Sequence, residues 1–468
     1  MDIIFFNTLG REKQVFKPIV PGKAGMYTCG PTVYNYQHIG NFRTFLFEDL
    51  LKRILLYNGY EVTHIMNITD VGHLVSDDDE GEDKMEKGSA REGKSVWEIA
   101  DYYTGVYLND AKLLNILPPT KYTKATDYIP EQIAMVQCLE DKGYTYKTSD
   151  GIYFNTSKLS DYGKLANLDI EGLEEGKRIE FSTEKKNKTD FALWKFSPKD
   201  EKRQMEWDSP WGKGFPGWHI ECSAMSKKFL GDTFDIHCGG IDHIPIHHTN
   251  EIAQSEACNG KPFVHYWLHG AFLEDEGKMS KSKGEFITVK TLTDKGYSPL
   301  DYRYLCLGTH YRKRLLFSWE GLDAAKSALT RLRSRIMEFR NSVQAESLKE
   351  DSAIAKYKKE FLESTNDDLN MPQALAVTWG VVRDESLSDS AKLSMLYDFD
   401  KVLGLNLDQQ PKAKNEAPDE VMKLVNQRNE AKKAKDFKLA DELRNKVKDM
   451  GWEIIDKIEG VEVKAIKN

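Results

Sequence analysis

The order of predicted elements near the start of the chain is the feature that most constrains its fold. An extended run at Met26–Gly30 breaks at a Gly-Pro pair, and Gly40 then opens a helix whose apolar residues recur at helical spacing. Another extended segment follows at Glu61–Asn67. This strand–loop–helix–strand order is typical of a parallel sheet that binds its ligand at the carboxyl ends of the strands.

Length and composition limit the class of protein. The chain has 468 residues, enough for roughly two to four domains. Its 40% hydrophobic and 30% charged residues are ordinary for a globular protein, and no apolar run approaches the ~20 residues that span a bilayer. A net charge of −8 argues against non-specific coating of nucleic acid but leaves room for a selective RNA partner.

The N-terminus and the cysteines indicate the compartment. Met1–Phe6 lacks a basic region and a cleavage site, so we expect no signal peptide. The six cysteines are too few and too scattered for a disulfide framework. We therefore expect reduced thiols and a cytoplasmic protein.

Composition shifts divide the chain into regions. Ser76–Lys94 is crowded with charged residues and glycine, and we expect a mobile surface insert there. Tyr122–Gly143 predicts a helix and Tyr144–Thr156 a hairpin. The apolar strand pattern returns at Phe234–Cys238, followed by a helix from about Ile246 to Cys258. The intervening residues therefore predict a subdomain inserted between two halves of one sheet.

The second half of the chain has a different pattern of apolar residues and fewer glycines. Amphipathic patterns with few glycines between Glu320 and Leu403 predict a helical bundle. Asn406–Pro418 is polar with two prolines and predicts a linker before a helical pair at Asp419–Met450. Pro411–Asn468 holds 14 Lys and Arg against 12 Asp and Glu, a slightly basic balance in an acidic chain.

Two short strings of residues are typical of a nucleotide-binding site. His38-Ile39-Gly40-Asn41 lies where a strand feeds a helix, whose N-terminus suits a phosphate. Lys278-Met279-Ser280-Lys281-Ser282 predicts a cationic loop whose lysines neutralise charge on a departing pyrophosphate. A turn histidine and a solvated lysine loop are the ordinary alternatives. The occurrence of both strings in this order favours binding of one nucleoside triphosphate from two sides of a split sheet.

Candidate metal ligands lie beside and between these strings. Cys29 stands at a strand end, Cys222 in a predicted helix at Trp218–Ser226, and His247 and Glu251 are spaced i, i+4 on one helix. A thiolate-rich zinc site beside an ATP site points to a sulfur-bearing substrate.

Spacing alone does not select among the possible ligands of this region. The competitors are His237, Cys238, His243 and His248. We expect only one of His247 and His248 to share a helix face with Glu251, because they lie about 100° apart around the helix axis.

Several longer blocks of the chain are distinctive. They are Phe6–Leu9, Thr28–Tyr34, Gly217–Met225, His247–Gln254, Thr309–Arg312, Phe317–Ser318 and, in the tail, Lys435–Phe437, Ala440–Asp441 and Arg444. With the two strings above, they resemble the cysteinyl-tRNA synthetases, a family of class I aminoacyl-tRNA synthetases. The resemblance covers nearly the whole chain.

The resemblance implies a role for each site residue. The zinc ligands would be Cys29, Cys222, His247 and Glu251. The cysteine pocket would be lined by Gly30, Thr69, Trp218, His237 and Asp242. The residues acting on ATP would be His38, Asn41, Lys278 and Lys281.

The resemblance also implies the reaction and the partners. Cysteine would be activated by ATP, with Mg²⁺, to cysteinyl-adenylate and then transferred to the 3′ end of the tRNA for cysteine. One Zn²⁺ per chain would tell sulfur from oxygen, and we expect a monomer without a membrane partner. The fold class is α/β, with a Rossmann-type parallel-sheet catalytic domain split by an inserted subdomain, then an α-helical bundle and a small C-terminal α/β domain.

The expected domain bounds follow from the same resemblance. They are 1–116 and 212–270 for the catalytic domain, 117–211 for the inserted connective subdomain, 271–319 for the lysine loop and stem-contact region, 320–405 for the helical bundle and 406–468 for the anticodon-binding domain.

The chain departs from the family pattern at three places. Asn41 stands where the first string usually has His, Cys238 replaces an expected glycine, and Val71-Gly72-His73 replaces a more usual Asp-Asp-Lys stretch. An amide at position 41 still donates a hydrogen bond, and Cys238 would tighten the nucleotide site.

Two other functions compete with this interpretation. A ligase of the same lineage that joins cysteine to an amino sugar would share the zinc and ATP blocks but would not need the tail. A zinc-stabilised RNA-binding module without catalysis would not need Lys278 and Lys281 in a loop.

Overall fold

The structure is a computed structural model, and it describes residues 1–72, 84–167, 184–198, 203–275, 286–342, 352–409, 419–434, 436–457 and 460–465. The chain divides into two compact units, Met1–Leu407 and Asp408–Asn468. Within the described ranges, none of the helices combines the length and apolar character that crossing a membrane requires.

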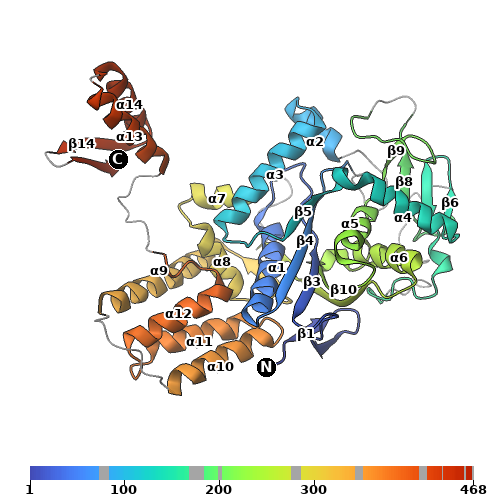
Figure 1. Ribbon diagram of the computed structural model, residues 1–468, viewed down its shortest axis with the longest axis horizontal. Helices are drawn as coiled ribbons and strands as arrows, with labels where there is room; N and C mark the ends of the chain where they lie inside the picture. The colour runs from blue at the N-terminus through green and yellow to red at the C-terminus, as the bar shows by residue number, and fades with distance from the viewer. Residues whose placement is uncertain are drawn as a thin grey trace. The chain divides into compact units, whose positions relative to one another are not determined.

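A five-stranded parallel sheet forms the centre of the larger unit (Figure 1). Its strands, in spatial order, are β11 (Val264–Gly270), β10 (Phe234–Gly240), β3 (Lys23–Thr28), β4 (Glu61–Ile68) and β5 (Lys121–Lys124). Helix α1 (Ile39–Tyr57) connects β3 to β4, and the hairpin of β1 (Ile4–Asn7) and β2 (Glu12–Val15) precedes them. The predicted parallel-sheet fold is confirmed.

Helix α1 begins where its sequence can satisfy the free N–H groups of its first turn. His38 is the N-cap: its Nδ1 accepts from the backbone N–H of Asn41, and the Asn41 side chain accepts from the backbone N–H of His38. The helix then buries apolar residues against the sheet, among them Leu51, Ile54 and Leu55. This packing fixes the start of α1 next to the carboxyl end of β3.

The segment between β4 and β10 carries the inserted elements. They are α2 (Lys84–Glu92), α3 (Val96–Leu113), α4 (Ile129–Asp141), an antiparallel sheet of β6 (Thr145–Lys147), β7 (Gly151–Phe154), β8 (Phe191–Phe196) and β9 (Gly214–Pro216), and α5 (Ile220–Leu230). Helix α6 (His247–Asn259) follows β10.

Two predictions for this segment are partly wrong. The helix predicted at Tyr122–Gly143 starts only at Ile129, because residues 121–124 pair with β4 as the edge strand of the main sheet. Part of the mobile insert predicted at Ser76–Lys94 is helix α2, whose Met85 is buried in a core shared with α3. Burial of Met85, together with hydrogen bonds from Gln204 to Glu86 and Ser89, docks this mostly polar helix. Residues 76–83 lie outside the described ranges.

The rest of the larger unit is mainly helical. It contains β12 (Leu273–Asp275) paired with β13 (Leu315–Phe317), helices α7 (Val289–Asp294) and α8 (Pro299–Leu307), and a bundle of α9 (Trp319–Ser342), α10 (Ser352–Asn366), α11 (Met371–Arg383) and α12 (Asp389–Leu403). The bundle shares one hydrophobic core with α1.

The smaller unit has its own core. It consists of α13 (Asp419–Lys433), α14 (Phe437–Asp449) and a hairpin of β14 (Trp452–Lys457) and β15 (Gly460–Ala465). Val421, Val425, Val447 and Ile454 pack together at its centre.

The expectation that all cysteines are reduced is wrong for one pair. Cys138 of α4 and Cys258 of α6 form a disulfide, with Cα atoms 5.7 Å apart. The two cysteines are far apart in sequence, and only the packing of α4 against α6 brings them together. Cys29, Cys222, Cys238 and Cys306 are free and buried.

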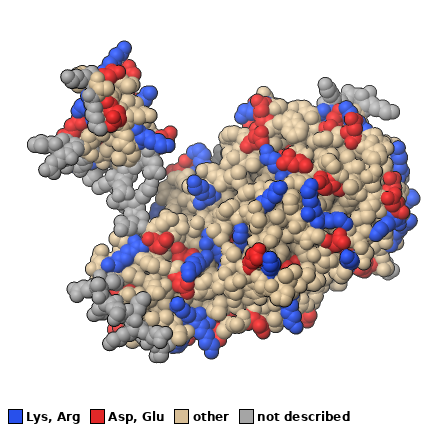
Figure 2. All heavy atoms as spheres, in the orientation of Figure 1, with Lys and Arg blue, Asp and Glu red and all other residues tan. Residues whose placement is uncertain are grey.

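Charged side chains are mixed over the surface. On the face shown in Figure 2, Lys and Arg side chains of the larger unit are interspersed with Asp and Glu. This face therefore shows no broad patch of one sign of charge.

Candidate functional site

A cavity of about 420 Å³ opens at the carboxyl ends of β3 and β10. Its lining includes Cys29 and Gly30 after β3, His38 and Asn41 at the start of α1, and Asp242 after β10. The carboxyl edge of a parallel sheet together with a helix N-terminus is an arrangement that binds nucleotides. Burial lowers the pKa of His38, so the ring is neutral at pH 7 and its Nδ1 serves as the acceptor in the cap.

Gly30 and Thr69 are held together by one amide side chain. Asn67 Oδ1 accepts from the backbone N–H of Gly30 at 2.7 Å, and Asn67 Nδ2 donates to Thr69 Oγ1 at 2.8 Å. A Cβ at position 30 would lie 1.8 Å from the carbonyl oxygen of Asn67, so only glycine fits there. Thr69 in turn donates to Glu221 at 2.7 Å. Asn67 and Glu221 were not selected from the sequence, although Glu221 lies in the block 217–225.

The four expected zinc ligands lie together in space. The ligand atoms of Cys29, Cys222, His247 and Glu251 are all within 4.8 Å of one another, and all four residues are buried. Cys29 comes from the end of β3, Cys222 from α5, and His247 and Glu251 from α6. Within this group His247 Nε2 lies 2.9 Å from Glu251 Oε1. Two thiols, one imidazole and one carboxylate, all buried and this close together, match the donor set of zinc.

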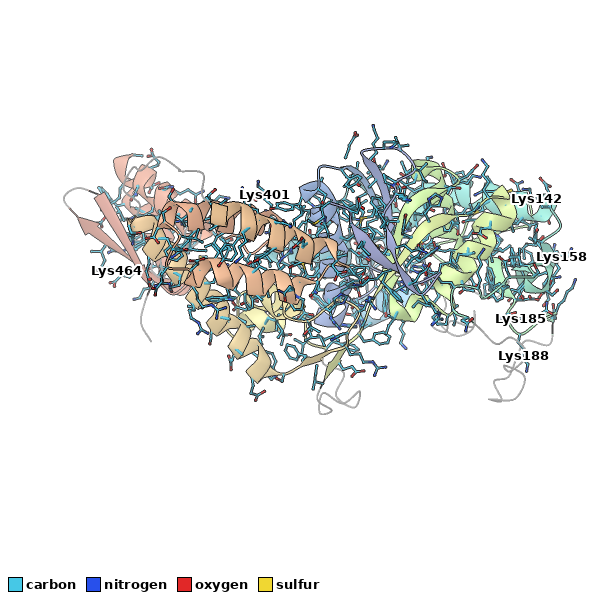
Figure 3. All side chains as sticks on the ribbon, turned by 90° about the horizontal axis from the view of Figure 1, so that it is seen from below. Lys142, Lys158, Lys185, Lys188, Lys401 and Lys464 are labelled. Atoms are coloured by element: carbon cyan, nitrogen blue, oxygen red, sulfur yellow. A yellow bond between two sulfur atoms is a disulfide. The ribbon has the colours of Figure 1, made fainter. Side chains whose placement is uncertain are left out.

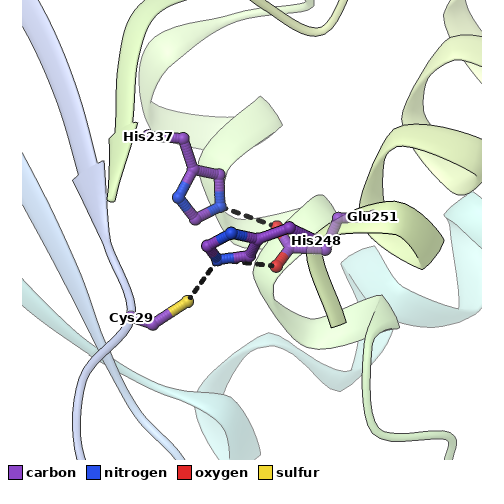
Figure 4. A group of neighbouring side chains, drawn as sticks. All are labelled: Cys29, His237, His248 and Glu251. Atoms are coloured by element: carbon purple, nitrogen blue, oxygen red, sulfur yellow. Dashed lines mark hydrogen bonds and ion pairs between the residues drawn. The ribbon is translucent and has the colours of Figure 1, made fainter. Parts of the chain in front are cut away.

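A second group of possible ligands shares two members with the first. Cys29, His237, His248 and Glu251 also lie within 4.8 Å of one another (Figure 4). His237 Nε2 contacts Glu251 Oε2 at 2.8 Å, and His248 Nε2 contacts Cys29 Sγ at 3.2 Å.

The expectation that His247 and His248 cannot both face Glu251 is wrong. His248 Nε2 lies 4.0 Å from Glu251 Oε1. Spacings i, i+3 and i, i+4 both place two side chains on the same helix face, so both imidazoles reach the carboxylate.

The hydrogen bond between Cys29 and Cys222 shifts the pKa values of the two thiols in opposite directions. Burial favours the neutral form of both, and it raises the pKa of Cys29 well above its ordinary value. Cys222 is also buried, but a hydrogen bond from Cys29 lowers the pKa of Cys222 to about 6. The pair therefore favours one thiolate, and a divalent cation would replace the remaining thiol proton.

Glu251 and His247 form a buried ion pair. Burial alone would raise the pKa of Glu251, but His237 and His247 hold it below its ordinary value. Burial would lower the pKa of His247, but Glu251 raises it well above the ordinary value. Behind this pair His248 hydrogen-bonds His269 at 2.8 Å, and His269 hydrogen-bonds Thr8 at 2.7 Å. These two hydrogen bonds fix the orientation of the His248 ring, and they were not predicted from the sequence.

The remaining site residues fall in three places. Trp218 packs on His247 with ring centroids 5.5 Å apart, and His237, a member of the second ligand group, stacks on Trp267. Cys238 points into the hydrophobic core against α1 and is absent from the cavity lining, so its expected tightening of the nucleotide site is not supported. Lys278, Lys281 and His73 lie outside the described residues.

The fold and cavity define a class I aminoacyl-tRNA synthetase. The family model described as the catalytic domain of class I (C) tRNA synthetases matches residues 15–327. Methionyl-tRNA synthetase of Mycobacterium tuberculosis bound by methionyl-adenylate shares the fold, with a TM-score of 0.55 at 15% identity over 82% of this chain and 90% of that one. A leucyl enzyme of Agrobacterium radiobacter in complex with tRNA gives a TM-score of 0.58 at 11% identity over 84% and 85% of the two chains.

Relatives with similar sequences show which amino-acid family within this class the chain belongs to. Cysteine–tRNA ligase 1 of Burkholderia lata is 51% identical over 98% of this chain and 96% of its own length. The cysteine–tRNA ligase of Treponema denticola is 46% identical over 96% and 97% of the two chains. The chain belongs to the cysteine–tRNA ligase family.

Proposed function

We propose that this protein activates L-cysteine with ATP to cysteinyl-adenylate and transfers the cysteine to the 3′ end of its tRNA, in the cytoplasm and as a monomer. The observation that carries the proposal is the buried thiol–imidazole–carboxylate cluster at the edge of the cavity. The amino-sugar ligase alternative is not supported, because the relatives match 96–98% of this chain, including the smaller unit.

The residues of the cavity have distinct tasks in this proposal. The N-terminus of α1, with His38 and Asn41, receives the ATP phosphates. Asp242, which lines the cavity, would bind the amino group of cysteine, and Thr69, held by Asn67 and Glu221 behind Gly30, would support the cysteine pocket. Lys278 and Lys281 neutralise the charge that passes to pyrophosphate, with Mg²⁺ accompanying ATP. Positioning and charge stabilisation carry the reaction without a covalent enzyme intermediate.

The metal explains how cysteine is told from serine. Zinc held by Cys29, Cys222, His247 and Glu251 would bind a substrate thiolate strongly and an alcohol poorly. A pocket that relied on shape alone would separate such near-isosteres by only about 10²-fold. Trp218 packs on the His247 ring and keeps that ligand in place.

Cysteine-dependent exchange of pyrophosphate into ATP tests the activation step, and transfer of labelled cysteine to tRNA tests the second step. Cys222→Ser should reduce the exchange rate at least ~100-fold and lower bound zinc, because it removes a metal ligand, while the KM for ATP stays unchanged. Cys306→Ser is the matched control: Cys306 is buried and free but belongs to neither ligand group. Near-normal exchange by Cys222→Ser would refute the zinc site.

A further inference from the structure

The Cys138–Cys258 disulfide lies outside the candidate site and close to the surface. The Cα separation of 5.7 Å is within the range that permits a bridge without backbone movement. Cys138 is half-buried and Cys258 is 6% exposed. The exposed Lys142 contacts the backbone carbonyl of Cys258, and Figure 3 places Lys142 at the end of the larger unit where the inserted subdomain lies. Because Cys138 is only partly buried, a small thiol or disulfide would approach the bridge from the side of Cys138.

The bridge encloses most of the candidate metal site. Its two cysteines are 120 positions apart, and Cys222, His247 and Glu251 lie within the loop of chain that it closes. Helix α4 packs directly on α5 and α6, which carry these three residues, through an apolar core that contains Val136, Leu139, Ala224, Ala253 and Ala257. Separation of α4 from this core would loosen the two helices that hold the ligands.

The free cysteines constrain the chemistry of the bridge. Cys29 and Cys222 have sulfur atoms within 4.8 Å of each other, and both are free. They must remain thiolates to bind zinc, so the site works only where thiols are kept reduced; this step rests on the proposed function. Under such conditions a disulfide near the surface exchanges with the thiol pool rather than persisting as a permanent crosslink.

We propose that Cys138 and Cys258 are a reversible thiol–disulfide pair, a redox modification site that clamps helix α4 onto α5 and α6. In the forward direction the thiolate of Cys138, the more exposed partner, attacks one sulfur of a low-molecular-weight disulfide and displaces the first thiolate. The thiolate of Cys258 then attacks the Cys138 sulfur of the mixed disulfide and displaces the second thiolate. Two electrons and two protons pass from the cysteines to the small disulfide, which leaves as two thiols.

Equilibration of the full-length protein with mixtures of reduced and oxidised glutathione tests the pair. After alkylation of the free thiols, mass spectrometry should detect a linked Cys138–Cys258 peptide whose fraction rises with the oxidised share. Thermal unfolding should show a Tm at least ~5 °C higher for the bridged form, because the crosslink restricts the unfolded chain. Zinc transfer to a chelating dye should be at least ~3-fold slower from the bridged form.

Matched variants separate this pair from the other cysteines. Cys138→Ser and Cys258→Ala should each abolish the linked peptide and the Tm difference, whereas Cys306→Ser should keep both. Absence of the linked peptide at every glutathione ratio, preferential formation of a Cys29–Cys222 bridge, or equal Tm values for the two forms would overturn the proposal. Peptide masses and Tm do not depend on activity, so a protein that forms the bridge but lacks cysteine activation would refute the proposed function alone.

Discussion

At the scale of single residues, Asp110 is an acid that the fold buries near the end of a helix. It is 7% exposed and lies near the end of α3, where the helix dipole disfavours a negative charge. Burial raises the pKa of Asp110 to about 6. Because this pKa lies above the unfolded value of about 3.9, the residue does not oppose folding below pH ~4, destabilises the folded state increasingly as the pH rises from ~4 to ~6, and imposes a constant penalty above that.

Asp110→Asn should therefore stabilise the protein in a pH-dependent manner. We expect the free energy of unfolding to rise by about 1–3 kcal/mol at pH 7.5 and to be unchanged near pH 3.5, since each unit of pKa shift corresponds to about 1.4 kcal/mol. Urea unfolding at the two pH values measures the difference. Asp101→Asn, on an exposed face of the same helix, is the control and should change stability by less than ~1 kcal/mol. Equal effects of Asp110→Asn at both pH values would contradict the assignment.

The sequence located part of the site because some of its geometry is local. His247 and Glu251 share a helix face through their spacing alone, and Gly40 marks a helix start. The convergence of Cys29 and Cys222 with them depends on the packing of α5 and α6 against the end of β3, which no local pattern encodes. The link from His248 through His269 to Thr8 joins three separate segments, and it was missed for the same reason.

At the scale of elements, Asp368 joins three parts of the larger unit. This fully buried carboxylate follows α10 and accepts from the backbone N–H of Phe6 at 2.9 Å and from the hydroxyl of Tyr311 at 2.7 Å. Arg312 Nη2 lies 2.6 Å from Asp368 Oδ2. The N-terminal hairpin, the segment after α8 and the helical bundle thus meet at one side chain.

Asp368→Asn should destabilise the larger unit by about 2–3 kcal/mol, because it removes a buried charge partner and sets an amide against Arg312. The neighbouring Asp367 pairs with Lys13, and both side chains are about half exposed. Asp367→Asn should therefore cost less than ~1 kcal/mol. Thermal and urea unfolding of the two variants provide the comparison. Similar stability losses would show that Asp368 does not hold these three segments together.

The elements that prediction missed were those fixed by long-range pairing. Residues 121–124 carry no signal that distinguishes a strand from the helix that follows, and only pairing with β4 makes them β5. Helix α2 is too polar to be recognised, and it exists because Met85 finds a partner surface on α3. By contrast, α1 and the bundle helices were predicted well because their apolar periodicity is long and regular.

At the scale of the whole molecule, the division into two units separates the two proposed steps. The candidate ligands and the cavity that the described residues form all lie in Met1–Leu407, so we expect activation of cysteine to depend on the larger unit. Transfer requires that tRNA be held, and we propose that the slightly basic segment from Pro411, with 14 Lys and Arg against 12 Asp and Glu, contacts its phosphates.

A chain that ends at Leu407 should therefore keep cysteine-dependent pyrophosphate exchange within about twofold of the full-length rate. Its kcat/KM for charging of tRNA should fall at least ~10-fold, because each lost phosphate contact weakens binding, and the residual charging should depend less steeply on salt. Parallel exchange and charging assays over a range of salt concentrations measure both effects. Loss of exchange would place part of the activation site in the smaller unit, and unimpaired charging would mean that the larger unit alone recognises tRNA.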